Sequence, residues 1–550
     1  MSEMLLPIAG FRLPAAIIAG RPAAARPWFP ACRRSAPGPA RFRLAAATPY
    51  PRAVPDSSDL TPRQRRAAAA LLREPAAAVN GLVRLFAAGG YELSLVGGSV
   101  RDAFLGRRTG GGDLDLATDA RPEQVREIAA GWADTIWETG IEFGTVGLRK
   151  GDTVCEITTY RSEEYQPGSR KPGVTYGRSL EADLARRDFT VNAMAAPLPS
   201  LELVDPFGGL RDLRARVLRT PGRPEDSFND DALRMLRAAR FAAQLGFAVA
   251  PEVAAAMTAM AGRLSVVSAE RISAELTKLI CSPGPDGPVR GISVLVDTGV
   301  AEQVLPEVPR LRLERDEHFR HKDVYQHTLT VLARATTLEP AYGLENDLRV
   351  RLAALLHDIG KPKTRRKLPG GRVAFHHHEV VGAVMAAERL TALRFPSAVV
   401  SDVSELVALH LRFHGYGERE WTDSAVRRYV RDAGHLLTRL HVLTRADCTT
   451  RNTAKAQRLE RAYDDLEKRI AVLSVQEELG KIRPDLNGNQ IMAILGVPEG
   501  PIVGKALRYL LGLRMDHGPL GRERAIHELL GWAAAEGLDV PEPPSEGDAD

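Results

Sequence analysis

The chain has 550 residues, of which 44% are hydrophobic and 26% charged, and its 74 basic and 69 acidic side chains give a formal charge of +5. These values are typical of a soluble globular protein of roughly three to four domains, and so small a basic excess does not by itself indicate nucleic acid. The four cysteines form no CxxC pair, so they indicate neither a disulfide framework nor a cysteine zinc site, and they fit a reducing, cytoplasmic compartment. We expect no membrane-spanning segment.

The two ends of the chain differ from the rest in composition. Residues 1–54 hold eight Arg, one Glu and no Asp or Lys, a bias found in transit peptides. However, nine prolines in the same stretch break any amphipathic helix. We therefore expect 1–54 to be a disordered extension, and the acidic, Pro-rich end at 538–550 to be a disordered tail.

Strands and helices alternate in the first third of the chain. Residues 56–90 predict one or two helices, which Asp59 or Thr61 can cap. Further helices are expected from 100–105 and over 121–130, and strands over 93–96, 114–117, 144–149 and 153–159. After residue 188 the pattern is mostly helical to about residue 535. The sequence predicts an α+β fold class, with a mixed α/β head followed by a mostly α-helical body.

A glycine pair and two aspartates form the first chemical pattern. Gly97 and Gly98 follow an apolar run and precede a helical one, so their backbone N–H groups can bind phosphate at a helix N-terminus. Asp113 and Asp115 lie two apart in a predicted strand, and their side chains therefore share one face. Paired carboxylates can hold a hard cation such as Mg²⁺. The combination predicts a metal-dependent enzyme that handles a nucleoside triphosphate; a surface turn with solvated aspartates is the alternative.

Three further segments could complete this site. Glu156, in a predicted strand, could bring a third carboxylate near the aspartate pair, or could be a solvated strand residue. The paired Arg186 and Arg187 suit triphosphate oxygens, and Asn192 could bond a ribose hydroxyl, although Arg-Arg-Asp is also a common solvated helix face.

The third segment contains Asp231 and Arg234. Their i, i+3 spacing predicts a shared helix face, which is ordinarily no more than a weak ion pair. Aspartate offers only acceptors and arginine only donors. Side by side, the two could read the Watson–Crick edge of cytosine or adenine.

These segments belong to a set of seven motifs between about residues 90 and 290. In chain order they are GGSVRD (97–102), DLDLAT (113–118), EITTYR (156–161), RRDFTVNAMA (186–195), VDPFGGLRDL (204–213), DDALRMLRAARF (230–241) and SAERISAEL (268–276). The set resembles the class II tRNA nucleotidyltransferases, the CCA-adding enzymes, with bacterial poly(A) polymerases as close relatives. The resemblance implies template-independent addition of CCA to tRNA 3′ ends from CTP and ATP by two-metal phosphoryl transfer.

The resemblance also implies roles for individual residues. Asp113 and Asp115 would be the catalytic residues and hold Mg²⁺, and Asp231 and Arg234 would stand in for a template. The residues implied to bind the nucleotide are Gly98, Ser99, Arg101, Arg187, Asp188, Asn192, Asp231 and Arg234. Asp230 departs from the family, which often has Glu there. The loop 161–180 resembles the flexible loop that helps CCA-adding enzymes switch from C to A.

A second constellation is rich in histidine, because seven of the thirteen histidines fall between residues 327 and 414. Imidazole and carboxylate suit Mn, Fe, Ni, Zn or Mg, whereas a single buried histidine is more often structural. The order H…HD…D resembles the HD-superfamily phosphohydrolases. The resemblance implies one divalent ion, Mg, Mn or Ni, with the ligands His327, His357, Asp358 and Asp447. A second metal site could use His378, His410 and His414.

The last helical stretch contains RPDLNG (483–488) and RMDHGP (514–519), and it resembles the C-terminal RNA-binding helices of the same enzymes. Basic residues there could meet tRNA phosphates, or could be a solvated face. They are Lys505, Arg508, Arg514, Arg522 and Arg524.

The sequence thus predicts six segments. They are a disordered extension (1–54), the nucleotidyltransferase head (55–195), nucleotide-recognition and neck helices (196–310), an HD metal-binding helical domain (311–470), C-terminal RNA-binding helices (471–537) and a disordered tail (538–550). We expect CCA addition, with tRNA, CTP and ATP as partners and no membrane. The alternatives are a poly(A) polymerase or A-adding enzyme, an HD-type phosphohydrolase acting on RNA ends or cyclic nucleotides, and a non-catalytic RNA-binding protein.

Overall fold

In the computed structural model the chain divides into two units, Met1–Val54 and Pro55–Asp550. The structure describes residues 62–107, 114–138, 141, 144–162, 175–177, 179–312, 323–369, 373–413, 421–449, 452–477 and 483–538. Several predictions fall outside these ranges: both end segments apart from residue 538, the caps Asp59 and Thr61, Asp113, His414 and most of the loop 161–180. The fold described below is that of the second unit.

A six-stranded mixed sheet forms the head, with strand order β3-β4-β5-β2-β1-β8. The strands are β1 (Ser94–Val96), β2 (Leu114–Thr118), β3 (Thr135–Trp137), β4 (Thr145–Lys150), β5 (Thr153–Thr159) and β8 (Ala195–Pro197). β2 and β5 run parallel, and the other neighbouring strands run antiparallel. The four predicted strands are confirmed. β3 and β8 were not predicted. They are as short as β1, but no glycine pair marks their ends as Gly97 and Gly98 mark the end of β1.

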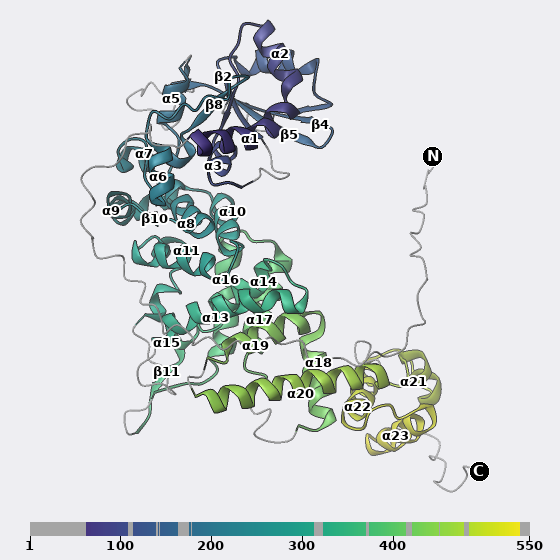
Figure 1. Ribbon diagram of the computed structural model, residues 1–550. Coiled ribbons are helices and arrows are strands. Elements are labelled where there is room, and N and C mark those ends of the chain that lie inside the picture. The colour runs from purple at the N-terminus through teal and green to yellow at the C-terminus, as the bar shows by residue number, and fades with distance from the viewer. Residues whose placement is uncertain are drawn as a thin grey trace, which may run out of the picture. The chain divides into compact units, whose positions relative to one another are not determined.

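Helices pack on this sheet and bury its apolar side chains (Figure 1). They are α1 (Pro62–Ala78), α2 (Asn80–Ala88), α3 (Gly98–Phe104) and α4 (Pro122–Ala130). On β5 the side chains of Cys155 and Ile157 are buried, whereas Glu156 between them is exposed. The alternation leaves polar side chains of β2 and β5 on one face of the sheet.

The chain after the head is largely helical, as predicted. The first group of helices comprises α5 (Leu180–Ala185), α6 (Gly209–Ala215), α7 (Pro224–Asp230), α8 (Arg234–Leu245), α9 (Pro251–Met260), α10 (Ala269–Ile280), α11 (Asp286–Asp297) and α12 (Ala301–Val304). α8 packs against both α10 and α11. Two short strands, β9 (Val217–Leu218) and β10 (Ala248–Val249), pair in parallel within this part.

The next group carries the predicted histidine cluster. Its helices are α13 (Val324–Leu338), α14 (Leu348–Leu356), α15 (Lys361–Thr364), α16 (His378–Ala392), α17 (Ser397–Leu409), α18 (Asp423–Ala433), α19 (Leu437–Asp447) and α20 (Thr453–Glu477). A two-stranded hairpin, β11 (Arg365–Lys367) with β12 (Val373–Phe375), interrupts them. One hydrophobic core runs from the head through α20, so these parts are packed together rather than strung on linkers.

The last three helices, α21 (Gly488–Leu495), α22 (Pro501–His517) and α23 (Arg522–Ala535), enclose a separate small core. They attach to α18, where Arg427 donates to the Met515 carbonyl at 3.1 Å and Arg428 pairs with Asp516 at 2.5 Å. Among the described helices, none has the length and apolar character needed to cross a bilayer.

Candidate functional sites

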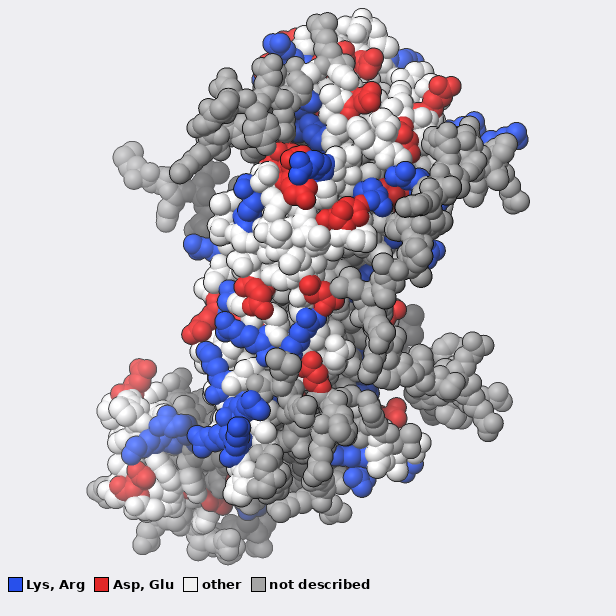
Figure 2. Space-filling model, turned by 90° about the vertical axis from the view of Figure 1, so that its left-hand side faces the viewer, with Lys and Arg blue, Asp and Glu red and all other residues white. Residues whose placement is uncertain are grey.

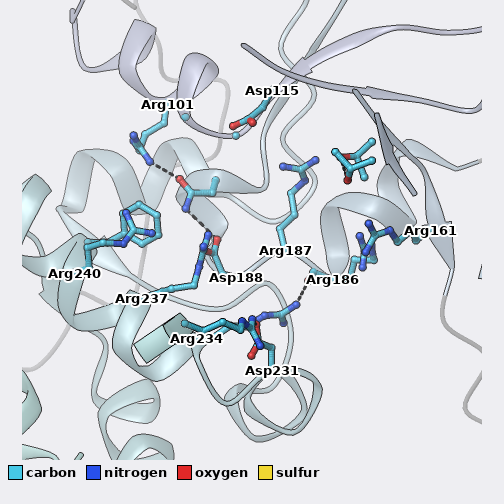
Figure 3. Close-up of a pocket in the computed structure, with 17 residues that line it drawn as sticks. Arg101, Asp115, Arg161, Arg186, Arg187, Asp188, Asp231, Arg234, Arg237 and Arg240 are labelled. Carbon is cyan, nitrogen blue, oxygen red and sulfur yellow. Dashed lines mark hydrogen bonds and ion pairs between the residues drawn. The ribbon is translucent and has the colours of Figure 1, made fainter. Parts of the chain in front are cut away.

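A cavity of about 770 Å³ lies between the polar face of the head sheet and the helices α8 and α10 (Figure 3). Its lining consists of Gly97, Gly98, Arg101, Asp115, Thr145, Thr158, Arg161, Arg186, Arg187, Asp188, Asn192, Asp231, Arg234, Arg237, Arg240, Phe241 and Arg271. Eight of these residues are arginines and three are aspartates. A cavity with this excess of guanidinium groups favours a polyanionic ligand.

Gly97 and Asp115 meet at the sheet end of the cavity. Gly97 precedes α3 with a φ of +66°, a conformation that L side chains rarely adopt. A Cβ atom there would lie 3.3 Å from Asp115 Oδ2 and 3.4 Å from Arg187 Nη1. The missing side chain therefore leaves room between a carboxylate and a guanidinium. Ser99, the second residue of α3, is buried and does not line the cavity.

Asp115 has a second carboxylate beside it, because its partner in the parallel pair of β2 and β5 is Glu156. Partners in adjacent strands point to the same face. The predicted proximity of Glu156 to the aspartate pair is thus confirmed for Asp115; Asp113 lies outside the described residues. Thr158, two positions beyond Glu156, extends the same polar face into the cavity.

A chain of hydrogen bonds links α3 to α8 along the cavity wall. Arg101 Nη1 donates to Asn192 Oδ1 at 2.7 Å, and Asn192 Nδ2 donates to Asp188 Oδ1 at 3.0 Å. Arg237 donates twice to Asp188 Oδ2, at 2.8 and 2.6 Å. Burial acts to raise the pKa of Asp188, but Arg237 and Asn192 outweigh it and hold that pKa below its usual value. Asp188 is therefore ionised, and both its oxygens are engaged in orienting other side chains.

The expectation that Asp231 and Arg234 share a helix face is wrong. Asp231 has an extended conformation after the end of α7, and α8 begins only at Arg234. Asp231 Oδ1 accepts the Leu233 N–H at 3.1 Å, a local bond with which aspartate competes against helix formation. Both side chains nevertheless line the same cavity, as Figure 3 shows.

Each of these two residues is held by its own partners. Arg234 donates to Ser227 Oγ at 2.8 Å and to the Arg186 carbonyl at 2.6 Å. Asp231 Oδ2 accepts from Arg271 Nη2 at 2.7 Å. The acceptor and the donor are therefore fixed separately, and Arg186 connects the head to α8.

Four arginines of the lining were not predicted: Arg161, Arg237, Arg240 and Arg271. Arg240 donates to Glu275 at 2.5 Å and lies 4.0 Å above the Phe241 ring. The signal was present, because Arg234, Arg237 and Arg240 recur at helical spacing and SAERISAEL contains both Arg271 and Glu275.

The histidine cluster forms a second candidate site, in which five elements converge. His327 comes from α13, His357 and Asp358 follow α14, His378 begins α16, His410 follows α17 and Asp447 ends α19. His327 Nε2 lies 2.9 Å from Asp447 Oδ1 and 3.3 Å from His357 Nε2. His378 Nε2 lies 3.3 Å from Asp358 Oδ1.

Two groups of donor atoms in this cluster are tight enough to hold a metal ion. One is His327, His357 and Asp358, and the other is Asp358, His378 and His410; within each, the atoms lie within 4.8 Å of one another. The predicted ligand Asp447 adjoins the first group, since its Oδ1 is 3.6 Å from His357 Nε2. Asp358 is common to both groups, whereas His376 and His377 are exposed and join neither.

Backbone carbonyls set the orientation of three imidazoles. The Nδ1 atoms of His357, His378 and His410 lie 2.9, 2.8 and 2.6 Å from the carbonyl oxygens three residues earlier. A carbonyl only accepts, so each Nδ1 carries a hydrogen, and each Nε2 faces the other members of the cluster. This is the orientation that a metal ligand requires.

The charges in the cluster also suit a cation. Burial acts to raise the pKa values of Asp358 and Asp447, but His357 and His327, respectively, outweigh it and lower them. Burial, reinforced by His357, lowers the pKa of His410 to about 3, so this ring is neutral. Burial acts to lower the pKa of His357, but Asp358 outweighs it and raises that pKa to about 8, so a metal ion would displace a proton from this ring. Two carboxylates and the imidazole nitrogens form a donor set that divalent transition metals and Mg²⁺ accept.

The predicted phosphate contacts near the C-terminus are partly engaged within the protein. Arg514 pairs with Asp485 at 2.8 Å and is largely buried, so it fastens α22 to the segment before α21. Lys505 pairs with Glu536 at 3.2 Å on the surface. Arg508 and Arg522 are exposed.

Three family models match the chain. Residues 93–219 match the Poly A polymerase head domain, 246–311 the "Probable RNA and SrmB- binding site of polymerase A" and 324–452 the HD domain. The cavity lining comes almost wholly from the first segment and from the helices that follow it, and the histidine cluster lies within the third.

Similar proteins span most of the chain. The A-adding tRNA nucleotidyltransferase of Deinococcus radiodurans is 34% identical over 76% of this chain and 91% of its own length. The CCA-adding enzyme of Geobacillus thermodenitrificans is 31% identical over 79% of this chain and 92% of its own. The crystal structure of the Bacillus stearothermophilus CCA-adding enzyme in complex with CTP matches with a TM-score of 0.60 and 26% identity, covering 87% of this chain and 99% of that one.

Proposed function

The chain belongs to the tRNA nucleotidyltransferase family, and from this premise we propose that it adds CCA to tRNA 3′ ends from CTP and ATP without a nucleic acid template. The observation that carries the proposal is the cavity, which has a carboxylate strand at one end, Asp231 and Arg234 at the other and arginines between them. This order matches the parts of a nucleoside triphosphate. A tRNA substrate supports the predicted cytoplasmic location.

Phosphoryl transfer belongs to the sheet end of the cavity. Asp113 and Asp115 would hold Mg²⁺, which when bound supplies Lewis-acid chemistry for attack by the RNA hydroxyl and departure of pyrophosphate. Arg101 and Arg187 bind the triphosphate oxygens, since guanidinium forks match them in shape and charge. Asp188 keeps Arg237 and Asn192 in place around the sugar and phosphates.

Base choice belongs to the helix end. Cytosine and adenine both present an amino donor beside a ring-nitrogen acceptor on the Watson–Crick edge. Asp231 accepts from the amino group and Arg234 donates to the ring nitrogen. Uracil and guanine reverse this order, and they would leave buried polar groups unpaired, a large penalty for a wrong substrate.

The polyanionic partner is tRNA. Figure 2 shows Lys and Arg side chains gathered in a contiguous patch on one face of the described surface. Phosphate contacts of this kind position RNA without reading its sequence and make binding depend on salt. The family matches support the division into a head, neck helices and an HD domain, and the predicted RNA-binding helices after residue 471 lie outside the three matches.

Incubation of the purified protein with a tRNA that lacks CCA tests the proposal. We expect incorporation of two C residues from CTP alone and of the complete CCA from both nucleotides. The runner-up is A-adding activity, as in the name of one relative. Incorporation of ATP onto a tRNA ending in CC, without any use of CTP, would show that the proposal is wrong.

Replacement of the strand carboxylate is the first mutational prediction. Asp115→Ala should abolish incorporation of both CTP and ATP, because a metal ligand is lost. The matched control is Asp152→Ala, an exposed aspartate in the turn between β4 and β5 that does not line the cavity. Residual incorporation by Asp115→Ala equal to that of the control would exclude the sheet end as the reaction centre.

We also propose that the histidine cluster hydrolyses phosphate esters, with Mg, Mn or Ni as the metal. The sharing of Asp358 between two donor groups favours this second function, because paired ions can bind both the attacking and the leaving oxygen of a phosphate. Release of p-nitrophenol from p-nitrophenyl phosphate should require one of these metals and be lost in Asp358→Asn. Unchanged release by that variant would refute the assignment.

A further inference from the structure

The hairpin β11–β12 and the short helix α15 lie between two members of the histidine cluster in the sequence. Asp358 precedes α15 by three residues, and His378 follows β12 by three. In Figure 1, α15 and β11 lie at the edge of the helical body. The helix α15 and the hairpin therefore form an insertion between two predicted metal ligands, Asp358 and His378.

Both ends of this insertion contact residues of the histidine cluster. A Cβ atom on Gly360 would lie 2.1 Å from the His378 carbonyl oxygen, so only glycine allows the chain to pass this closely. Lys361 Nζ donates to Asp358 Oδ2 at 2.9 Å. The carbonyl of Phe375, the last residue of β12, receives the Nδ1 hydrogen of His378. The segments on both sides of the hairpin are thus in direct contact with the predicted metal ligands Asp358 and His378.

The helix α15 and the strand β11 that follows it are strongly basic. Lys363, Arg365, Arg366 and Lys367 are all exposed, and residues 361–369 contain no acidic residue. Lys363, Arg366 and Lys367 form no ion pair with any described residue. Arg365 pairs in register with Phe375, so the basic strand starts beside the two exposed histidines, 376 and 377, that lead to His378.

This distribution of charge favours an extended polyanion. Neighbouring cations on one strand repel each other, and a bound anion removes that cost. Arg365 and Lys367 point to one face of β11 and are separated by roughly 7 Å along the strand, whereas Arg366 points to the other face, so the strand presents cations to phosphates on both sides.

We propose that α15 and β11 form an RNA-binding surface that leads a single-stranded RNA end, with its terminal phosphate, to the histidine cluster. The proposal rests on the phosphohydrolase function proposed above and narrows its substrate class to RNA ends. Lys363, Arg366 and Lys367 bind backbone phosphates, and the terminal phosphate lies at Asp358 and His378.

The test compares two triple variants of the full chain. The first is Lys363→Gln/Arg366→Gln/Lys367→Gln. The matched control is Arg66→Gln/Arg73→Gln/Arg84→Gln, which removes three exposed charges from α1 and α2. The probe is a fluorescent RNA dodecamer with a 3′-phosphate, and its anisotropy is followed from about 50 to about 300 mM KCl with excess CCA-ended tRNA as competitor.

The hairpin variant should bind the probe about tenfold more weakly at low salt, and the slope of log Kd against log salt should fall by about 2. The control should keep the native affinity and slope. Manganese-dependent phosphate release from the RNA should fall in the hairpin variant, while release from p-nitrophenyl phosphate stays at the native rate.

An unchanged salt slope in the hairpin variant, or an equal loss in the control, would overturn the proposal. The proposal would also be overturned if the hairpin variant lost binding to polyglutamate but kept its affinity for RNA. That result would identify an acidic protein as the partner. If the native chain hydrolyses no phosphate ester at all, the phosphohydrolase function fails, and the salt slope still decides whether the hairpin binds RNA.

Discussion

The three aspartates of the cavity are used in three different ways. Asp115 is exposed on its strand, Asp188 has both oxygens bound by neighbouring side chains, and Asp231 is bound by a backbone N–H and by Arg271. Asp115 and Asp231 line the cavity at opposite ends, whereas Asp188 orients the side chains between them. Asp231 is oriented by Arg271, a residue 40 positions away in sequence.

The Arg271–Asp231 pair gives a prediction at this scale. Arg271→Ala should raise the KM for CTP and ATP about two- to fivefold and increase misincorporation of UTP, with kcat little changed, because exposed ion pairs are weak. Steady-state kinetics with each nucleotide measures this. Arg263→Ala, which removes an exposed arginine outside the cavity lining, is the control. Equal KM values for the two variants would contradict the orienting role.

At the scale of elements, one carboxylate of α20 accepts three of the hydrogen bonds that attach this helix to the HD domain. Glu467 Oε1 accepts from Tyr342 Oη at 2.6 Å, His441 Nδ1 at 3.0 Å and Arg445 Nε at 3.1 Å. Burial acts to raise the pKa of Glu467, but these hydrogen bonds outweigh it and lower the pKa from 4.5 to about 2. A group with a depressed folded pKa stabilises above its unfolded pKa, and the stabilisation is lost as the pH falls through the folded value.

Glu467→Gln should therefore lower Tm most above about pH 4.5, and the difference from the native chain should shrink as the pH falls toward 2. Thermal scans over this range measure it. The control is Glu460→Gln, an exposed position on the same helix. A Tm difference that does not change with pH would show that the carboxylate charge is not what holds α20.

The helices and strands that could be predicted from the sequence are those with local signals. β5 and α4 follow from alternation and from Pro122, which are local signals. The break at Asp231 could not be foreseen, because helical spacing continues through it and only the bond to Leu233 reveals the interruption. Likewise, the convergence of Arg237 and Arg271 on one cavity depends on the packing of α8 against α10, which no local pattern encodes.

At the scale of the whole molecule, a buried arginine joins the neck helices to the HD domain. Arg351 on α14 is 2% exposed and pairs with Glu339 through two bonds of 2.8 Å. It also donates to the carbonyls of Ile280 and Ser282, at 3.0 and 2.8 Å, at the end of α10. The helix that borders the cavity is thus tied to the helix that leads to His357.

Arg351→Met should destabilise this junction by about 3–5 kcal/mol, because it leaves the Glu339 carboxylate buried and unpaired. The expected readouts are a lower Tm and faster proteolytic cleavage between α10 and α14. The control is Arg349→Met, which removes another arginine of α14. Arg349 pairs with Asp402 of α17, and its loss should lower the free energy of unfolding by at most about 1 kcal/mol. Equal sensitivity of the two variants would show that the buried pair does not hold the junction.

The hydrogen bond from Arg234 to the Arg186 carbonyl has a consequence for protein engineering. A chimera that exchanges only residues 93–219 with a relative would take Arg186 and Asp188 from one parent and Arg234 and Arg237 from the other. The hydrogen bonds from Arg234 to Arg186 and from Arg237 to Asp188 would then join residues of two parents that did not evolve together. The smallest segment to exchange when altering nucleotide preference therefore extends from residue 93 to Glu275, because the Glu275 carboxylate accepts a hydrogen bond from Arg240 of the cavity.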